Sequence, residues 1–126
     1  MRNLIFFLFF LLSSVVSASA QDVVEWTPAQ ISAKLKTATS SVILDVRTQG
    51  EYSQGHLAKA VNMDVNAPGF DQKIQTLDKK KTIYVYCAAG VRSRKAAAIL
   101  KQKGFNAVSM SGGIQSWTAA GLPVVK

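Results

Sequence analysis

The chain contains one cysteine, Cys87, and it stands where a nucleophile could be activated. It follows the apolar run 83–86, and a short segment with small side chains separates it from a helical pattern that begins near Arg92. This order predicts a strand end, a tight loop and a helix start. Consecutive backbone N–H groups in such a loop can point at one spot, beside the positive end of the helix dipole. Because a thiol held there has a lowered pKa, Cys87 is the candidate nucleophile.

The residues expected to bind a substrate are those of the loop itself, namely Ala88, Ala89, Gly90, Val91 and Arg92. Small side chains at positions 88–90 let the backbone curl closely around the sulfur, and Gly90 can adopt the positive φ that other residues resist. Arg92 is the charged side chain of the loop, and a guanidinium offers several donors to an oxyanion. The alternative interpretation is a cysteine buried as a small hydrophobic residue at a strand end.

Asp45 and Arg47 form a second group of polar residues, two positions apart after another apolar run. A carboxylate and a guanidinium so placed are expected to hold neighbouring loops by charge-assisted hydrogen bonds, as structural support. One cysteine and one histidine, His56, cannot supply the four ligands of a structural zinc site, and a single cysteine allows no internal disulfide. We therefore expect neither a metal nor a cofactor.

Strand and helix patterns alternate along the chain. Buried strands are predicted at 42–44 and 83–86, and shorter ones at 23–26, 60–63 and 107–110. Helices are predicted at 28–38, 49–54, 92–103 and 112–119, and around Phe70, Ile74 and Leu77. The first should begin at Thr27 as N-cap, followed by Pro28. The alternation predicts an α/β fold, a small parallel β-sheet with helices on both faces, with ligands at the carboxyl ends of the strands.

Residues 1–20 have the pattern of a secretory signal peptide. Arg2 precedes the apolar run 4–12, and the segment closes on Ala18, Ser19 and Ala20, which predicts cleavage before Gln21. The apolar run is well short of the roughly 20 residues that span a bilayer. We expect a single domain at 21–126 that is exported, soluble and periplasmic, with no stable membrane association after the signal is removed.

The chain is basic, with 15 Lys and Arg against 7 Asp and Glu and a formal charge of +8. Apart from the lysine run 79–81 and the cluster after the cysteine, these charges are scattered. They form no stripe interleaved with aromatic residues, of the kind that binds single-stranded nucleic acid. The charge therefore favours a small anionic substrate, and we expect no nucleic-acid partner.

Beside the cysteine loop, three blocks of residues carry a family resemblance. They are Asp45, Val46, Arg47, Glu51 and Tyr52; Gly55, His56, Leu57, Ala60 and Asn62; and Gly112, Gly113, Trp117, Gly121, Pro123 and Val124. In this combination the chain resembles the rhodanese family of sulfurtransferases, in a single-domain, exported form, over about residues 26–125. The resemblance implies a rhodanese-like fold. It also implies that Cys87 becomes a persulfide, taking sulfur from a donor such as thiosulfate and passing it to cyanide or a thiol.

The resemblance further implies that the loop 88–92 holds the anionic donor and the persulfide, and that His56 belongs to a turn remote from the chemistry. The larger thiosulfate enzymes of the family often carry a basic residue directly after the cysteine. This chain has Ala88 there, so the charge available to a donor anion comes from Arg92, with Arg94 as a second candidate. Substrate preference therefore stays open, including whether the acceptor is a protein.

Two other functions remain as alternatives. One is a non-catalytic periplasmic sulfur carrier that holds a persulfide for a partner. The other is a cysteine phosphatase or arsenate reductase, which also places a cysteine in an anion-binding loop. Cysteine phosphatases have five residues between the cysteine and the arginine, whereas four separate Cys87 from Arg92. The chain has no second cysteine for arsenate reduction and no evident aspartic acid to act as general acid, so sulfur transfer is favoured.

Overall fold

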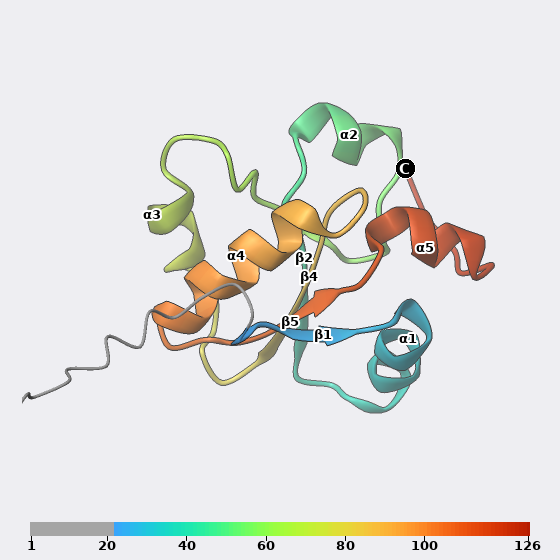
Figure 1. Cartoon of the computed structure of the whole chain (residues 1–126), viewed down its shortest axis with the longest axis horizontal. Coiled ribbons are helices and arrows are strands. Elements are labelled where there is room, and N and C mark those ends of the chain that lie inside the picture. Colours follow the sequence, from blue (N-terminus) through green and yellow to red (C-terminus); the bar gives the residue numbers. More distant parts are fainter. Residues whose placement is uncertain (1–21) are drawn as a thin grey trace, which may run out of the picture.

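The computed structural model describes residues 22–126, so the predicted signal peptide at 1–20 lies outside the described residues. Strands and helices alternate throughout this part of the chain (Figure 1). In order, they are β1 (Val24–Trp26), α1 (Pro28–Thr37), β2 (Ser41–Asp45), α2 (Gln49–Gln54), β3 (Val61–Asn62), α3 (Phe70–Ile74), β4 (Thr82–Tyr86), α4 (Val91–Gln102), β5 (Asn106–Met110) and α5 (Gly113–Ala119).

The strands form one sheet in the order β1-β5-β4-β2-β3, and every neighbouring pair is parallel. The central strand β4 pairs with β2 along its whole length, so that Asp45 lies beside Tyr86 at the carboxyl edge. Cys87 follows Tyr86 directly and therefore leaves the sheet at the edge where parallel α/β folds bind ligands. The predicted α/β class and the parallel sheet are confirmed.

Helices cover both faces of the sheet, as predicted (Figure 1). Side chains alternate along β4, because successive residues of a strand point to opposite faces. Ile83 and Val85 pack in a core with residues of α3 and α4, whereas Tyr84 and Tyr86 pack in a second core with residues of α1 and α5. The strand is thus buried on both faces, which explains its continuous apolar run.

Element boundaries follow local signals in most places. Thr27 caps α1, with its side chain accepting from the Gln30 N–H, and Pro28 is the first helical residue. The helix expected around Phe70, Ile74 and Leu77 is shorter than its apolar pattern and ends at Ile74. Thr76 donates its hydroxyl proton to the Lys73 carbonyl at 2.7 Å, a local bond that competes with helix continuation. Leu77 consequently lies in the turn that follows.

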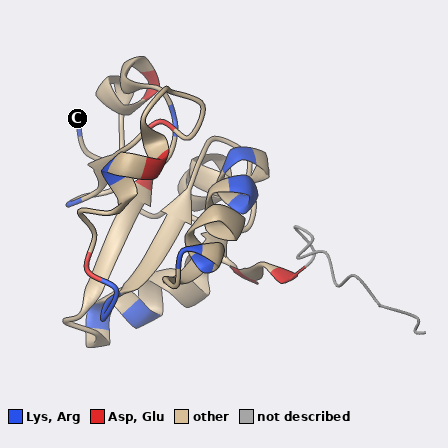
Figure 2. Cartoon of the chain, turned by 90° about the vertical axis from the view of Figure 1, so that its left-hand side faces the viewer, with Lys and Arg blue, Asp and Glu red and all other residues tan. Residues whose placement is uncertain are grey.

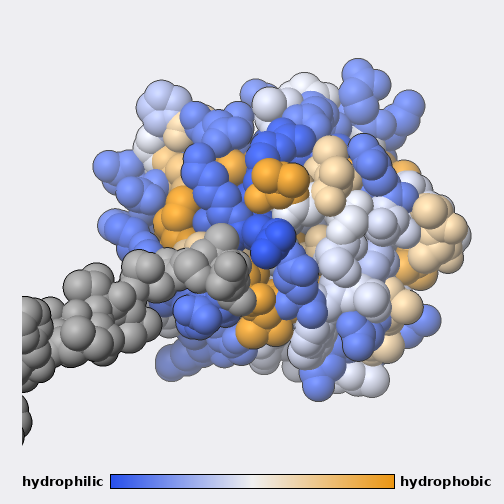
Figure 3. Space-filling model, viewed as in Figure 1, coloured by the Kyte–Doolittle hydropathy of each residue, from blue (hydrophilic) through white to orange (hydrophobic). Residues whose placement is uncertain are grey.

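Charged and apolar residues are both dispersed over the parts of the surface that Figures 2 and 3 show. In the view of Figure 2, Lys and Arg are spread over several helices and loops. Figure 3 shows apolar residues as separate patches among hydrophilic ones on the face in view. Within residues 22–126, no helix is long and apolar enough to cross a membrane.

Candidate active site

Cys87 lies at the bottom of the loop that joins β4 to α4, and only 1% of it is exposed. The Gly90 N–H donates to its Sγ at 3.1 Å, and the Ser93 N–H reaches the same atom at 3.4 Å. Gly90 has φ 108°, a left-handed conformation that glycine adopts without strain. The structure therefore contains the convergent backbone donors that the order strand, glycine loop and helix predicts.

The start of α5 supports the loop from behind. The Ile114 N–H donates to the Cys87 carbonyl at 2.9 Å, and the Gln115 N–H donates to the Ala88 carbonyl at 3.1 Å. The first residue of this helix, Gly113, has φ 62°, and a Cβ there would lie 2.5 Å from both of these carbonyl oxygens. Because α5 binds the carbonyl side of the loop, the N–H groups of the loop are left to face the sulfur.

Ser93 is a site residue that the sequence analysis did not single out. It lies in the first turn of α4, is fully buried, and places its Oγ 3.6 Å from Cys87 Sγ. A hydroxyl at the third position of a helix that follows a cysteine loop is the signal that could have identified it. The Ser93 N–H donates to Sγ and the Ser93 Oγ accepts from the Cys87 thiol, so Ser93 contacts the sulfur twice.

Two opposing influences set the pKa of the Cys87 thiol. Burial is the largest and raises the pKa, because the thiolate loses solvation. Hydrogen bonds from the Ser93 side chain and from the backbone of Ser93, Gly90 and Ala89 lower it, and their combined effect prevails. The pKa therefore lies below the ordinary value of a cysteine. A buried thiol with a lowered pKa is a nucleophile held out of solvent.

Arg92 lies on the rim of the loop, where its guanidinium is already engaged. It donates to both carboxylate oxygens of Glu51 on α2, at 2.7 and 2.9 Å. The hydrogen bond from Arg92 is the largest influence on the pKa of Glu51, which falls to about 2. Cys87 and Arg92 also attract each other electrostatically. Sequence spacing placed Arg92 in the loop but could not identify Glu51, which is 41 residues away, as its partner.

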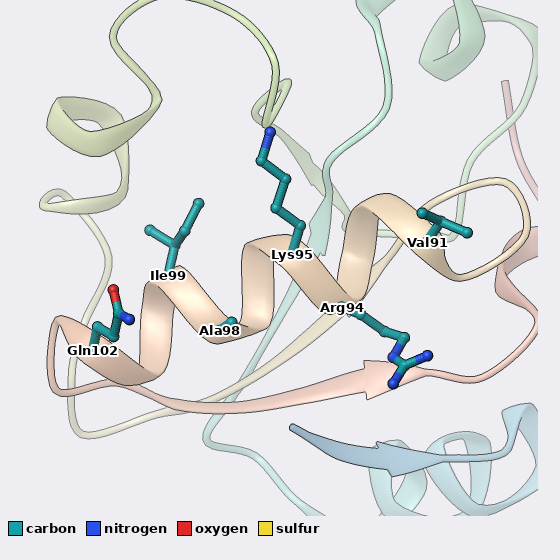
Figure 4. Close-up of a pocket in the computed structure, with 6 residues that line it drawn as sticks. All are labelled: Val91, Arg94, Lys95, Ala98, Ile99 and Gln102. Atoms are coloured by element: carbon teal, nitrogen blue, oxygen red, sulfur yellow. The ribbon is translucent and has the colours of Figure 1, made fainter. Parts of the chain in front are cut away.

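Arg94, the second candidate cation, points away from α4 toward the β1 side of the sheet (Figure 4). Its Nε lies 2.9 Å from a carboxylate oxygen of Glu25 on β1. Figure 4 also shows a surface pocket along the outer face of α4, lined by Val91, Arg94, Lys95, Ala98, Ile99 and Gln102. Cys87 is not among these residues, so the pocket is separate from the sulfur. Val91, the first residue of α4, lies at the start of that face and is 78% exposed.

Asp45 and Arg47, which the sequence predicts to be structural support, form a buried ion pair. The Arg47 side chain donates to both oxygens of the Asp45 carboxylate and to the Gly55 carbonyl, at 2.7 to 3.2 Å. Tyr86 donates its hydroxyl proton to the same carboxylate at 2.6 Å and accepts from the Leu57 N–H. Burial is the main reason that the pKa of Tyr86 is raised. The network joins β2, β4 and the loop before β3 next to the cysteine.

His56 makes structural contacts. Its ring stacks on Tyr52, with centroids 3.7 Å apart, and its Nδ1 lies 2.9 Å from the Tyr52 carbonyl oxygen. Its backbone pairs with Val125 near the C-terminus. These contacts agree with a histidine that shapes a turn, as the family resemblance implied.

Comparison with known proteins agrees with this geometry. The family model of the Rhodanese-like domain matches residues 27–120. A sulfurtransferase of Allochromatium vinosum is 30% identical over 96 residues, which cover 75% of this chain and 88% of that protein. The thiosulfate sulfurtransferase GlpE of Coxiella burnetii is 35% identical over 79 residues, covering 62% and 72%.

The same family appears among solved structures. The crystal structure of a rhodanese-related protein from Thermoplasma volcanium superposes with a TM-score of 0.73 at 34% identity, covering 81% of this chain and 97% of that one. The parallel sheet, the buried cysteine at its carboxyl edge and the family match over most of the described residues agree. The chain belongs to the family of rhodanese-like domains.

Proposed function

We propose that this protein is a sulfurtransferase of the rhodanese type that carries sulfur as a persulfide on Cys87. The observation that carries the proposal is the pair of backbone N–H groups that donate to the sulfur at 3.1 and 3.4 Å, with the Ser93 hydroxyl 3.6 Å away. They favour the thiolate, which is the attacking species, and they are already aimed at the position where negative charge resides. Two curated relatives are named as sulfurtransferases.

The reaction balances with thiosulfate as donor. The Cys87 thiolate attacks the outer sulfur of thiosulfate, a new S–S bond forms, and sulfite leaves with the electron pair of the bond that breaks. The negative charge then lies on the outer sulfur of the persulfide. An acceptor, either cyanide or a thiolate, attacks that sulfur and departs as thiocyanate or as a new persulfide. Cys87 regains its thiolate, and no protein group has to supply or remove a proton.

The loop 88–92 would bind the donor anion, with backbone N–H groups as its main donors. Because Ala88 and Ala89 carry no charge, the cation of the loop is Arg92, whose charge is shared with Glu51. Thiosulfate would have to compete with the Glu51 carboxylate for this guanidinium. A small anion suits the site better than a large one, because the cysteine is almost completely buried.

Intact-mass measurement tests the proposal. Incubation of the purified protein with thiosulfate should add the mass of one sulfur atom, and cyanide should remove it with release of thiocyanate. Cys87→Ser should do neither while keeping its fold, because a hydroxyl is nearly the same size but far harder to ionise. Ser111→Ala is a matched control outside the loop, and it should load normally. Thiocyanate formation by Cys87→Ser at the wild-type rate would overturn the mechanism.

The same experiment separates an enzyme from a sulfur carrier. An enzyme releases many equivalents of thiocyanate per protein when thiosulfate and cyanide are both in excess. A carrier that needs its protein partner would load once and release no more than one equivalent. We propose the enzyme, because the donors around Cys87 favour a free thiolate after each transfer, and that thiolate can attack again.

We also propose that the protein is exported and acts as a soluble periplasmic domain. The support is the pattern of residues 1–20, with Arg2, the apolar run 4–12 and the ending Ala18, Ser19, Ala20. N-terminal sequencing of the protein recovered from its cells should begin at Gln21. Recovery of the full chain with Met1 from the cytoplasm would contradict this proposal without affecting the proposed chemistry.

A further inference from the structure

Ser109 is a buried hydroxyl on the strand next to the cysteine strand. It is fully buried on β5, in register with Val85 of β4, and Val85 packs in the apolar core shared with α4. Paired residues of neighbouring strands share a face, so Ser109 points to the α4 side as well. A hydroxyl in such surroundings is costly unless it is hydrogen-bonded, which makes its partner informative.

That partner is Ser93, the residue whose hydroxyl reaches the sulfur. The Ser109 hydroxyl donates to Ser93 Oγ at 2.9 Å. Ser93 in turn donates to the Gly90 carbonyl at 3.1 Å, and its Oγ lies 3.6 Å from Cys87 Sγ. Ser93 is also fully buried, so neither hydroxyl can exchange its partner for bulk water. A line of polar contacts thus runs from β5 through the first turn of α4 to the sulfur.

We propose that Ser109 is a positioning residue, which holds the Ser93 hydroxyl where it can donate to the Cys87 sulfur. The inference rests on the proposed function only in taking Cys87 as the reactive group. Ser93 has one hydroxyl proton, which donates to the Gly90 carbonyl while Oγ accepts from the Cys87 thiol. Once the thiol ionises, Sγ becomes a second acceptor within reach of that proton. When Cys87 is protonated, Ser93 donates to Gly90; when the thiolate forms, the hydroxyl turns toward it.

Ser109 acts in the same way in both states. Its donated bond occupies a lone pair of Ser93 Oγ, so the single Ser93 proton remains directed at the other acceptors. A hydroxyl that accepts one hydrogen bond is also a stronger donor in the next, because neighbouring bonds polarise each other. Neither serine gains or loses a proton at any step. Loss of Ser109 would leave Ser93 free to turn and would weaken its bond to the thiolate.

Other charges around Cys87 stay the same when Ser109 changes. The charged groups around the cysteine loop are Arg92 of α4, its partner Glu51 of α2, and Asp64, which also acts on Arg92. The elements next to the loop also carry the Asp45–Arg47 pair at the end of β2 and Arg94, Lys95 and Lys101 of α4. The residues of β5 and α5 carry no charge, and the two tyrosines of β4 lie on the opposite face of the sheet. A change in thiol titration after substitution of Ser109 can therefore be assigned to its hydroxyl.

Alkylation of Cys87 by iodoacetamide, followed by intact mass as a function of pH, tests the proposal on the full folded chain. Ser109→Ala removes one atom and should fold. The pH midpoint of its alkylation rate should rise by about half a unit, because the hydrogen bond from Ser93 to the thiolate is weakened. At pH values well below the midpoint, alkylation should be about threefold slower than in the wild type. The plateau at high pH should match the wild type. Ser111→Ala, whose hydroxyl donates to the Trp26 carbonyl, should leave the whole profile unchanged.

A double substitution shows whether Ser109 acts through Ser93. Ser93→Ala alone should raise the midpoint further than Ser109→Ala does, and adding Ser109→Ala to it should change nothing more. The inference would be overturned if the midpoint in Ser109→Ala were unchanged, whether or not the plateau was lower. It would also be overturned if Ser109→Ala shifted the midpoint equally in the presence and in the absence of the Ser93 hydroxyl. Because alkylation needs no sulfur donor, the result stands apart from whether thiosulfate loads the protein.

Discussion

Glu51 and Arg92 hold each other by two hydrogen bonds, of 2.7 and 2.9 Å, although they are 41 positions apart in the chain. Glu51 also completes the cap of α2, because its carboxylate accepts from the Thr48 N–H while Thr48 accepts from the Glu51 N–H. The start of α2 is thereby joined to the first turn of α4, immediately after the cysteine loop. Arg92 thus holds the rim of the loop, and we propose that it also attracts the donor anion.

Arg92→Ala should weaken the use of thiosulfate. The substitution removes the cation of the cysteine loop and leaves the Glu51 carboxylate unpaired on the rim, where it repels an anion. Loss of a charged hydrogen bond is worth about 1.5–3 kcal/mol, so kcat/KM for thiosulfate should fall roughly ten- to a hundredfold. Transfer from an uncharged persulfide donor should fall much less. The measurement is thiocyanate formation with each donor.

Glu51→Gln separates the two tasks of Arg92. The amide keeps the shape of the carboxylate but not its charge, so Arg92 stays in place with its charge less neutralised. We expect thiosulfate use equal to or above that of the wild type. A loss as large as that of Arg92→Ala, with both donors, would mean that the pair shapes the rim and does not select the anion.

The same pair makes stability depend on pH in an acidic range. Folding lowers the pKa of Glu51 from 4.5 to about 2, mainly through the hydrogen bond from Arg92. The unfolded chain therefore takes up this proton first as the pH falls, and the stabilisation is complete above about pH 4.5 and lost toward pH 2. The Arg92 and Glu51 side chains are 27% and 35% exposed, so we expect the pair to contribute only about 0.5–1 kcal/mol of stability.

Urea unfolding of wild type and Glu51→Gln at several pH values measures this contribution. The wild type should be the more stable at pH 6, and the difference should shrink between pH 4.5 and the lowest pH at which both still fold. A difference that stays constant over this interval would show that the carboxylate charge does not contribute.

Some parts of this site can be predicted from the sequence and others cannot, for a physical reason. The alternation of strands and helices, the cap at Thr27 and the donors around Cys87 follow from patterns within a few residues, and the structure contains all of them. The pairs Glu51–Arg92 and Ser93–Ser109 join residues 41 and 16 positions apart. Their partners are decided by how strands and helices pack, which local spacing does not encode.

Gly113→Ala tests the support of the cysteine loop by α5. A Cβ at this position would lie 2.5 Å from the Cys87 and Ala88 carbonyl oxygens, which are backbone atoms with little freedom to move. The left-handed φ of 62° adds about 1–2 kcal/mol of strain. We therefore expect the free energy of unfolding to fall by more than about 2 kcal/mol, and iodoacetamide to report an altered Cys87 environment.

Gly121→Ala is the matched control for this substitution. Gly121 has a similar φ of 75°, but a Cβ there would meet no atom within 4 Å. In Gly121→Ala the free energy of unfolding should fall only by the cost of the left-handed backbone, about 1–2 kcal/mol. The reactivity of Cys87 should be unchanged. Equal losses of stability in the two variants, measured by urea unfolding, would remove the close approach of α5 from the explanation.

The four-residue interval between Cys87 and Arg92 predicts which chemistry the loop excludes. The donors at 3.1 and 3.4 Å converge on the sulfur itself, and Arg92 is turned to Glu51. A cysteine phosphatase must hold a tetrahedral group with several oxygens above the sulfur and also needs a general acid for the leaving group. We therefore expect no hydrolysis of an aryl phosphate by the wild-type protein, under conditions in which thiocyanate forms.

An enlarged loop extends the test. A glycine inserted between Ala89 and Gly90 moves the Gly90 N–H away from Sγ, and donors stabilise developing charge only when they are already aimed at it. This variant should lose thiocyanate formation and gain at most weak binding of phosphate or arsenate, without hydrolysis. A glycine inserted between Lys79 and Lys80, in the turn before β4, is the control and should keep the wild-type activity. Thiocyanate formation and hydrolysis of the aryl phosphate are measured for the wild type and both variants at equal protein concentration. Hydrolysis of the aryl phosphate that depends on Cys87 in the wild type would replace sulfur transfer with the phosphatase alternative.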